Sequence, residues 1–262
     1  MSERDPRTDL LFTYFTDTWA DAAQRGFCFT LDRCVLLAAG DPRVRSVTVA
    51  NPYRSWAVSS VRWLQGRRPP PPPQGQASSA VLRPMRLRRH DPTSPAAVAR
   101  AYRRYDARLC RYLARSGVEE PVVVTANPFV AAWCPLEWAA SVTYYGYDDW
   151  AALEANRRLW PAIRAAYREI GAGGRRVAAV SQPILDKIDP VGPRALIPNG
   201  VEPQEWQRPW SSPGWVEEVE SPLVLYLGVI EPRLDVEALT AVCEELPDAT
   251  VALVGPVADA SV

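Results

Sequence analysis

Short apolar runs, separated by polar or helical segments, recur along the whole chain. Strands of a parallel sheet are buried on both faces, so they appear in a sequence as brief runs of Val, Ile, Leu and aromatic residues. Seven such runs precede residue 200 and two follow it, which predicts an α/β protein with a doubly wound parallel sheet. The runs are residues 10–15, 44–50, 80–87, 121–126, 141–145, 177–180, 195–197, 223–227 and 250–254.

Helical spacing separates most of these runs. Ser94 followed by Pro95 is typical of a helix N-cap and first turn, and the apolar positions after it predict a helix that ends at Arg115. We expect further helices after Asn51, with an apolar stripe up to residue 64, and from Asp148 through residue 170. Pro84 indicates that the third run is an edge strand.

The pattern changes between residues 201 and 222. Four Pro and three Trp stand there without helical or strand periodicity, which predicts an interdomain linker at 201–222. We therefore expect an N-terminal Rossmann-like domain at 1–200. Residues 223–262 hold two strands and one helix, which is less than an ordinary domain, so they predict the start of a second Rossmann-like domain in a truncated chain.

Several short motifs follow one another in the second half of the chain. They are Val-Ser at 180–181, Ile-Pro-Asn-Gly-Val at 197–201, Tyr-Leu-Gly at 226–228, Arg-Leu-Asp at 233–235, Leu-Pro-Asp at 246–248 and Val-Ala-Leu-Val-Gly-Pro at 251–256. In order and spacing they resemble family 4 glycosyltransferases of the GT-B fold, most of all bacterial enzymes of cell-wall and capsular polysaccharide synthesis. The resemblance covers the chain well from about Tyr144 onward and the first half only in outline. It implies a retaining transferase that uses a nucleotide-diphosphate sugar and no further cofactor.

Composition narrows the chemistry. Thirty basic and thirty acidic residues give no net charge, so nothing draws the whole chain to nucleic acid. The bases are nearly all Arg, which is typical of coding bias. One His and five Cys without ligand spacing argue against a metal site or a disulfide framework. A GxGxxG fingerprint and a P-loop are absent from the sequence. With no signal peptide or spanning segment evident, we expect a cytoplasmic protein.

The exit of the first strand is a candidate acceptor site, because ligands of open α/β sheets bind beyond the carboxyl ends of strands. The resemblance implies acceptor binding by Trp19 in this loop and by the bend at Arg25 and Gly26. An alternative is that Gly26 only caps a turn and Arg25 is solvated. The resemblance also assigns Asp148 and Asp149 to the acceptor, whereas as plain charges they would suit a helix N-terminus.

Asn127 follows the fourth strand, where similar transferases carry a polar residue, often His, at the reacting centre. It is the catalytic candidate, although an asparagine orients a hydroxyl and cannot take a proton.

The donor candidates are Gly228 and Arg233. A glycine at a strand exit lets backbone approach a ligand, and an Arg near a helix N-terminus can pair with the leaving diphosphate. The family commonly adds a Lys a few residues later, which this chain lacks. An alternative is that Arg233 only pairs with Glu237. The turn at Asn199 and Gly200 tolerates left-handed backbone and is also expected to present amides to the donor.

Two surface segments suggest partners. The arginines on the 95–115 helix predict either a solvated face or contact with anionic headgroups at the inner face of the plasma membrane, near a lipid-linked acceptor. The Pro-rich segment 69–76 predicts an extended surface loop.

Two functions remain open. The first is a glycosyltransferase acting on a glycan or lipid-linked acceptor in cell-surface polysaccharide synthesis. The second is a non-catalytic binding subunit. The family's pair of glutamates, separated by seven residues, belongs to the part of the second domain that we expect to be missing, so we expect no turnover by these 262 residues alone.

Overall fold

The structure is a computed structural model, and it describes residues 6–56, 70–87, 90–207, 209, 211–219, 222–231 and 233–257. The chain divides into two compact units, Met1–Val201 and Glu202–Val262. Each unit is described by itself, because their positions relative to one another are not determined.

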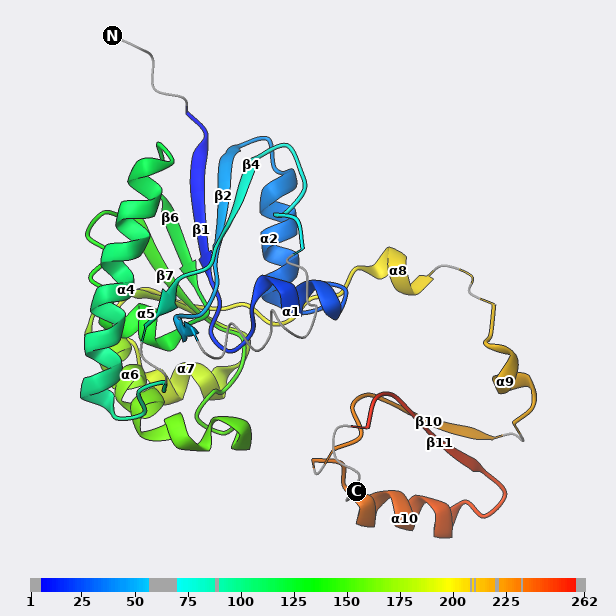
Figure 1. Cartoon of the computed structure of the whole chain (residues 1–262). Coiled ribbons are helices and arrows are strands. Elements are labelled where there is room, and N and C mark those ends of the chain that lie inside the picture. Colours follow the sequence, from blue (N-terminus) through cyan, green and yellow to red (C-terminus); the bar gives the residue numbers. More distant parts are fainter. Residues whose placement is uncertain are drawn as a thin grey trace. The chain divides into compact units, whose positions relative to one another are not determined.

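Seven parallel strands form the sheet of the first unit, as the apolar runs predict (Figure 1). Their order in the sheet is β4-β2-β1-β6-β7-β8-β9, so the chain winds from β1 to one edge and then returns to build the other side. The α/β class and the doubly wound parallel sheet are therefore confirmed, and the switch point lies between β1 and β6. The strands are β1 (Thr8–Thr13), β2 (Val44–Ala50), β4 (Ser78–Leu82), β6 (Val122–Thr125), β7 (Ser141–Gly146), β8 (Arg176–Ala179) and β9 (Arg194–Leu196).

Helices cover both faces of this sheet. One face packs against α1 (Trp19–Gln24) and α2 (Thr30–Gly40). The opposite face packs against α4 (Pro95–Arg115), α5 (Pro128–Trp133), α6 (Trp160–Ala172) and α7 (Gln182–Ile188).

The first strand and its exit supply side chains to both faces. Leu11 and Phe15 are buried against the α4–α7 layer, whereas Phe12 and Tyr14 are buried against the α1–α2 layer. This alternation explains why the sequence shows one continuous apolar run instead of a two-residue period. Each fully buried side chain of this size stabilises the fold by roughly 1.5–3 kcal/mol, so the exit of β1 is a rigid part of the molecule.

The predicted third strand is interrupted. Pro84 ends the ladder after β4, and the chain then forms β5 (Met85–Arg86), which pairs in parallel with β3 (Arg54–Ser55). β4 is an edge strand, as Pro84 indicates. The helix expected after Asn51 is not formed at residues 54–55, and its remainder from residue 57 lies outside the described residues.

No helix begins at Asp148. Residues 148–153 form turns, the 3₁₀ helix η1 (Glu154–Leu159) follows, and α6 begins only at Trp160. Pro161 explains the late start, because proline suits the first turn of a helix and lacks the N–H that an α-helix running through it from Asp148 would need. The predicted helix is therefore wrong over its first twelve residues.

The second unit contains one parallel strand pair with a helix between its strands. β10 (Leu223–Leu227) pairs with β11 (Thr250–Val254), and α10 (Val236–Glu245) connects them. The segment expected to be an unstructured linker includes two short helices, α8 (Pro203–Gln207) and α9 (Gly214–Glu217). No side chain of this unit is buried among those the structure describes.

Candidate functional site

A cavity of about 330 Å³ opens where β1 and β2 end. Its floor is formed by residues that follow these strands, and α4, α5 and η1 provide further walls. This is the carboxyl edge of the parallel sheet, where such folds bind ligands. The lining residues are Phe15, Thr16, Pro52, Tyr53, Arg54, Arg86, Asp91, Pro92, Val98, Ala101, Tyr102, Phe129, Asn156 and Leu159.

A buried cation lies on one wall of this cavity. Arg86 is only 7% exposed, and its Nε donates a hydrogen bond of 3.1 Å to the carbonyl of Tyr53. Its guanidinium lies 5.6 Å from the centre of the Tyr53 ring and pairs with the carboxylate of Asp91. A guanidinium held between an aromatic face and a carboxylate is suited to orienting an anionic or hydroxyl-rich ligand.

Aromatic rings form the opposite wall. Tyr102 lies edge-on to both Tyr53 and Phe129, with ring centres 6.4 Å and 5.3 Å away, and Phe129 is edge-on to Phe15 at 5.1 Å. Edge-to-face packing of this kind fixes the orientation of each ring. The cavity therefore combines an aromatic wall with one buried charge, that of Arg86.

Asn127 does not line this cavity. It is fully buried, and its Nδ2 donates to the carbonyl of Tyr14 at 3.0 Å and to the hydroxyl of Tyr102 at 3.1 Å. Its Oδ1 accepts the amides of Phe129 and Val130, so it caps α5. The catalytic assignment is corrected accordingly: every hydrogen-bonding position of this side chain holds β1, α4 and α5 together.

A second polar cluster follows β1 on the α2 side of the sheet. The carboxylate of Asp32, which is fully buried, accepts hydrogen bonds from the Tyr14 hydroxyl at 2.8 Å and from Arg25 at 3.1 Å. Arg25 also pairs with Asp17 at 2.8 Å and lies 4.0 Å from the centre of the Phe29 ring. The alternative of a solvated Arg25 is therefore wrong.

The charges of this cluster stabilise one another. Burial opposes the charge of Arg25, but the carboxylates of Asp32 and Asp17 outweigh that effect and raise its pKa. Burial, reinforced by Asp32, also raises the pKa of the Tyr14 hydroxyl, which stays protonated and donates. Asp17 is the partly exposed end of the cluster, with 29% of its side chain accessible. It is the member that can contact a ligand.

Trp19 and Gly26 have structural roles around this cluster. Trp19 is 1% exposed, packs against the tilted ring of Phe27 with ring centres 4.7 Å apart, and donates its indole N–H to the carbonyl of Pro71. It thereby fixes the described part of the Pro-rich segment, and its burial contradicts direct acceptor contact. Gly26 has a φ of +72° just after α1, so the alternative of a turn-capping glycine is confirmed.

Asp148 and Asp149 follow β7 at the same edge of the sheet. The Asp149 carboxylate pairs with Lys187 of α7 and accepts the amide of Ala151 at 3.2 Å. Asp148 accepts the amide of Asp149 at 2.8 Å. These bonds shape a turn, so the alternative of helix N-terminal charges is wrong, and acceptor binding by this pair stays a prediction.

Asn199 and Gly200 follow β9, and both are exposed. The Thr30 hydroxyl in the first turn of α2 donates to Asn199 Oδ1 at 2.8 Å. Gly200 does not adopt the left-handed backbone that such a turn tolerates. Their contribution to donor binding stays a prediction.

In the second unit, a hollow of about 500 Å³ lies between the end of β10 and the start of α10. Arg233 and Asp235 line it together with Glu231. Gly228 lies beside it, and a Cβ placed on Gly255 would come within 1.8 Å of the Gly228 carbonyl oxygen. The two glycines therefore permit a close approach of the strand ends to each other.

Arg233 pairs with Glu231, and its Nε donates to Oε1 at 2.6 Å. The alternative pairing with Glu237 is not formed. α10 begins at Val236, three residues later than Arg233, and Asp235 caps it by accepting the Ala238 amide at 2.9 Å. Arg233 is thus in the loop before the helix, with 76% of its side chain exposed.

Sequence reasoning missed three residues of these sites. Arg86 is one of several arginines around a predicted strand end, and only its position two residues after Pro84 distinguishes it. Tyr53 follows the Asn-Pro turn after β2, which marks it as a strand-exit residue. Nothing in the sequence marks Asp32, because a carboxylate in the first turn of a helix is ordinary.

Among the described residues no three His, Cys, Asp or Glu side chains gather as a metal site would require, and all five cysteines are free thiols. No described helix combines the length and apolarity needed to cross a bilayer.

No family model matches the chain, and no curated protein matches it. Among solved structures, the chain is similar to Arabidopsis thaliana UGT89C1 complexed with UDP-L-rhamnose, at 15% identity and a TM-score of 0.44 over 94% of this chain. The same plant protein complexed with quercetin gives 12% identity and a TM-score of 0.46 over 95% of this chain. The chain spans 64% and 70% of the length of these two structures. Likeness of this degree assigns no activity by itself.

Proposed function

We propose that this protein is a glycosyltransferase that takes a sugar from a nucleotide-diphosphate donor and passes it to a hydroxyl-bearing acceptor. The proposal rests on the ordered motifs that resemble GT-B transferases, on the doubly wound sheet that precedes them, and on polar sites at strand ends in both units. Retention of configuration and a cell-surface polysaccharide or lipid-linked acceptor follow from the resemblance and are part of the proposal.

The observation that carries the proposal is the hollow after β10. Glycosyl transfer leaves negative charge on the departing diphosphate, and an Arg with nearby helix N-terminal amides stabilises such charge. Arg233 supplies the cation, and the amides of Val236 and Glu237 have no acceptor among the described residues. Binding requires Arg233 to exchange the carboxylate of Glu231 for phosphate oxygens.

The acceptor, in this proposal, occupies the cavity after β1 and β2. Its aromatic wall suits the apolar face of a sugar or lipid-linked headgroup, and Arg86 orients a hydroxyl or anionic substituent. No protein nucleophile is required, because the diphosphate is already a good leaving group. The chemistry then depends on positioning and on charge at the donor phosphate.

Calorimetric titration of the chain with UDP and GDP tests the donor site. We expect one of the two to bind and Arg233→Ala to weaken it by about tenfold, the usual loss for a charge-assisted phosphate contact. Glu231→Gln should strengthen binding, because it frees Arg233. Binding is the readout because it reports the contact of Arg233 with the diphosphate directly.

Arg194→Gln is the matched control, since it removes an exposed arginine of the first unit and should leave the affinity unchanged. Failure of both nucleotides to bind, or binding that Arg233→Ala and Glu231→Gln leave unaltered, would refute the donor assignment.

A further inference from the structure

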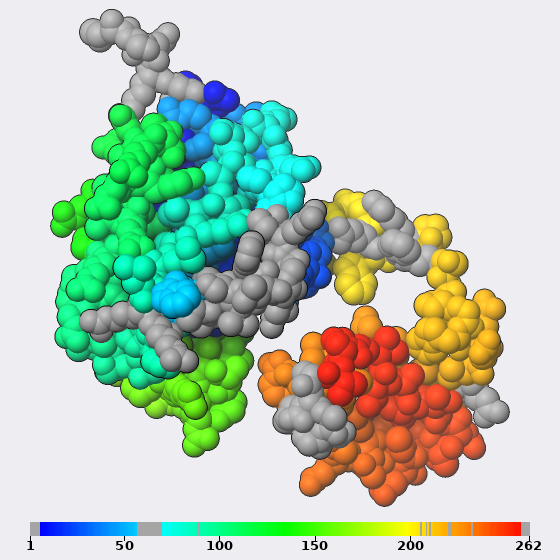
Figure 2. All heavy atoms as spheres, viewed as in Figure 1, coloured from blue at the N-terminus to red at the C-terminus, as the bar shows by residue number. Residues whose placement is uncertain are grey.

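The longest helix of the first unit presents a line of arginines to solvent. The spacing of four, four, three and four residues puts five of them within about 80° of the circumference of α4, over a length of about 22 Å. All five are exposed. α4 lies at the surface of its unit (Figure 2), so the whole line is accessible. These five residues, Arg100, Arg104, Arg108, Arg111 and Arg115, are called the arginine stripe.

The stripe is not neutralised within the described parts of the chain. None of its arginines has a carboxylate within 4 Å there, and Arg108 instead donates to the carbonyl oxygen of Met85. The one acid of α4, Asp106, is half-buried and accepts the amide of Leu136 at 3.1 Å. Because the whole chain has no net charge, the stripe is a local concentration of positive charge.

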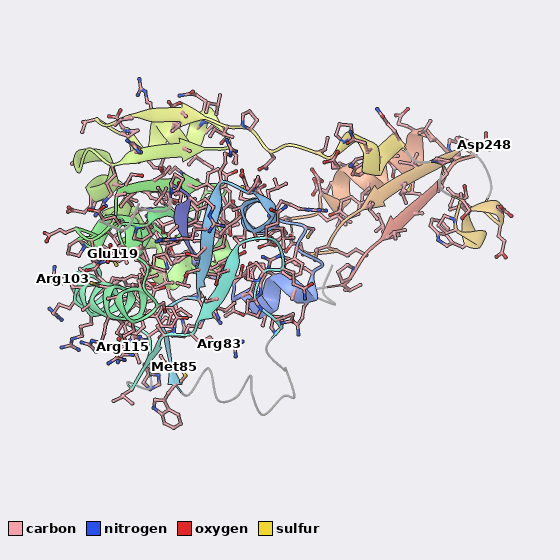
Figure 3. The ribbon with its side chains drawn as sticks, turned by 90° about the horizontal axis from the view of Figure 1, so that it is seen from above. Arg83, Met85, Arg103, Arg115, Glu119 and Asp248 are labelled. Atoms are coloured by element: carbon pink, nitrogen blue, oxygen red, sulfur yellow. The ribbon has the colours of Figure 1, made fainter. Side chains whose placement is uncertain are left out.

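Exposed apolar side chains flank the stripe. Trp56, Met85 and Leu87 are 48%, 49% and 87% exposed. The pairing of β3 with β5 brings their chain segments together, and the bond from Arg108 to Met85 joins this small sheet to α4. Figure 3 shows Met85 and Arg115 on the same side of the first unit. Large apolar side chains next to a cationic helix face are costly to leave in water.

We propose that the arginine stripe and its apolar flank dock on an anionic lipid bilayer surface, with α4 lying along the headgroups. Charge complementarity supplies the attraction, since each base close to an anionic leaflet contributes about a fivefold increase in binding. The apolar flank favours a bilayer over a soluble polyanion, because a bilayer buries such side chains just below the headgroups that pair with the arginines. This inference does not depend on the proposed glycosyl transfer.

Cosedimentation of the full chain with phosphatidylglycerol-rich vesicles tests the proposal. We expect Arg100→Gln with Arg104→Gln to reduce partitioning about 25-fold, since two bases are removed. Binding should weaken as salt is raised and should be absent on pure phosphatidylcholine. The matched control is Arg176→Gln with Arg194→Gln, which removes two exposed arginines from β8 and β9 and should leave partitioning unchanged.

A second variant tests the apolar flank. Leu87→Ser should reduce partitioning about tenfold and leave the far-ultraviolet spectrum unaltered, because Leu87 is exposed in the free protein. The proposal is overturned if the stripe and control variants lose partitioning equally. It is also overturned if the wild type does not bind anionic vesicles, or if the stripe variant loses binding to a single-stranded oligonucleotide while keeping vesicle binding.

Discussion

The two units are built from the same local pattern and differ in what surrounds it. In the first unit, β2 is flanked by β1 and β4 and covered by α2, and its Val47 and Val49 are fully buried. In the second unit, the more apolar β10 pairs with β11 alone, and Leu225 and Leu227 are 50% and 70% exposed. An apolar run and strand pairing therefore suffice to form an element, whereas burial requires helices on the faces of the sheet.

Matched substitutions in the two units test whether burial causes the difference between them. The same chemical change should have a large effect in the first unit, where side chains have lost their contact with water. It should have a small effect in the second, where the same groups remain solvated. Hydrogen exchange of the strand amides reports the stability of each unit separately, because it measures local opening.

Substitutions in ion pairs should give the largest difference between the two units in the free energy of unfolding that is lost. Asp32→Asn leaves Arg25 with only Asp17 in a largely buried position, and it should lower the free energy of unfolding of the first unit by about 4 kcal/mol. Glu231→Gln removes the carboxylate that pairs with the exposed Arg233 and should cost less than about 1 kcal/mol. The measurement is exchange at the amides of β1 and of β10.

Equal losses from these two substitutions would contradict the prediction. They would mean that solvent screens both pairs alike, despite the full burial of Asp32. Tyr14→Phe is a useful control, because it removes one of the hydrogen bonds to Asp32 without touching the charge pair. It should cost about 1 kcal/mol.

Most strands could be predicted from the sequence because burial on both faces leaves a clear trace. Residues 44–50, 223–227 and 250–254 form strands with the predicted bounds, and the end of α4 at Arg115 is also as predicted. The helix expected from Asp148 was wrong over its first part, because the proline at position 161 has no N–H with which an α-helix could continue through it. A single residue without a backbone donor outweighs the apolar spacing around it.

The sites were harder to predict, because side-chain contacts between distant residues leave no local pattern. Asn127 lies at the expected strand exit, yet its hydrogen bonds to Tyr14 and Tyr102 give it a structural role. Arg25 was singled out for acceptor binding, which stays a prediction, and its partner Asp32 could not be identified from the sequence. Position along the chain thus predicts which residues lie at the sheet edge. Only the structure distinguishes exposed side chains from those whose hydrogen bonds are already made within the fold.

Leucine substitutions should give the second largest difference between the two units in lost stability. Leu11 is fully buried in β1, and Leu11→Ala should destabilise the first unit by about 3 kcal/mol through lost burial and the cavity it leaves. Leu227→Ala in β10 should change the stability of the second unit by less than about 0.5 kcal/mol, because that side chain is largely in water. Exchange at the amides of each strand measures both. A cost above about 2 kcal/mol at Leu227 would show that β10 is covered in solution.

Helix caps should give the smallest difference, because both caps make the same local bond. Asn127 and Asp235 each accept a backbone amide in the first turn of the helix that follows. Asp235→Ala should cost about 1 kcal/mol, the ordinary value of a solvated cap, and should show as faster amide exchange in the first turn of α10. Asn127→Ala should cost about 2 kcal/mol or more, because it also leaves the buried Tyr14 carbonyl without its side-chain donor. Asn127→Ser keeps a capping oxygen but lacks the amide donor, so it should recover only the part of the loss that Asp235→Ala measures. Full recovery by serine would mean that the bonds from Asn127 to β1 and α4 contribute nothing to the exit of the first strand.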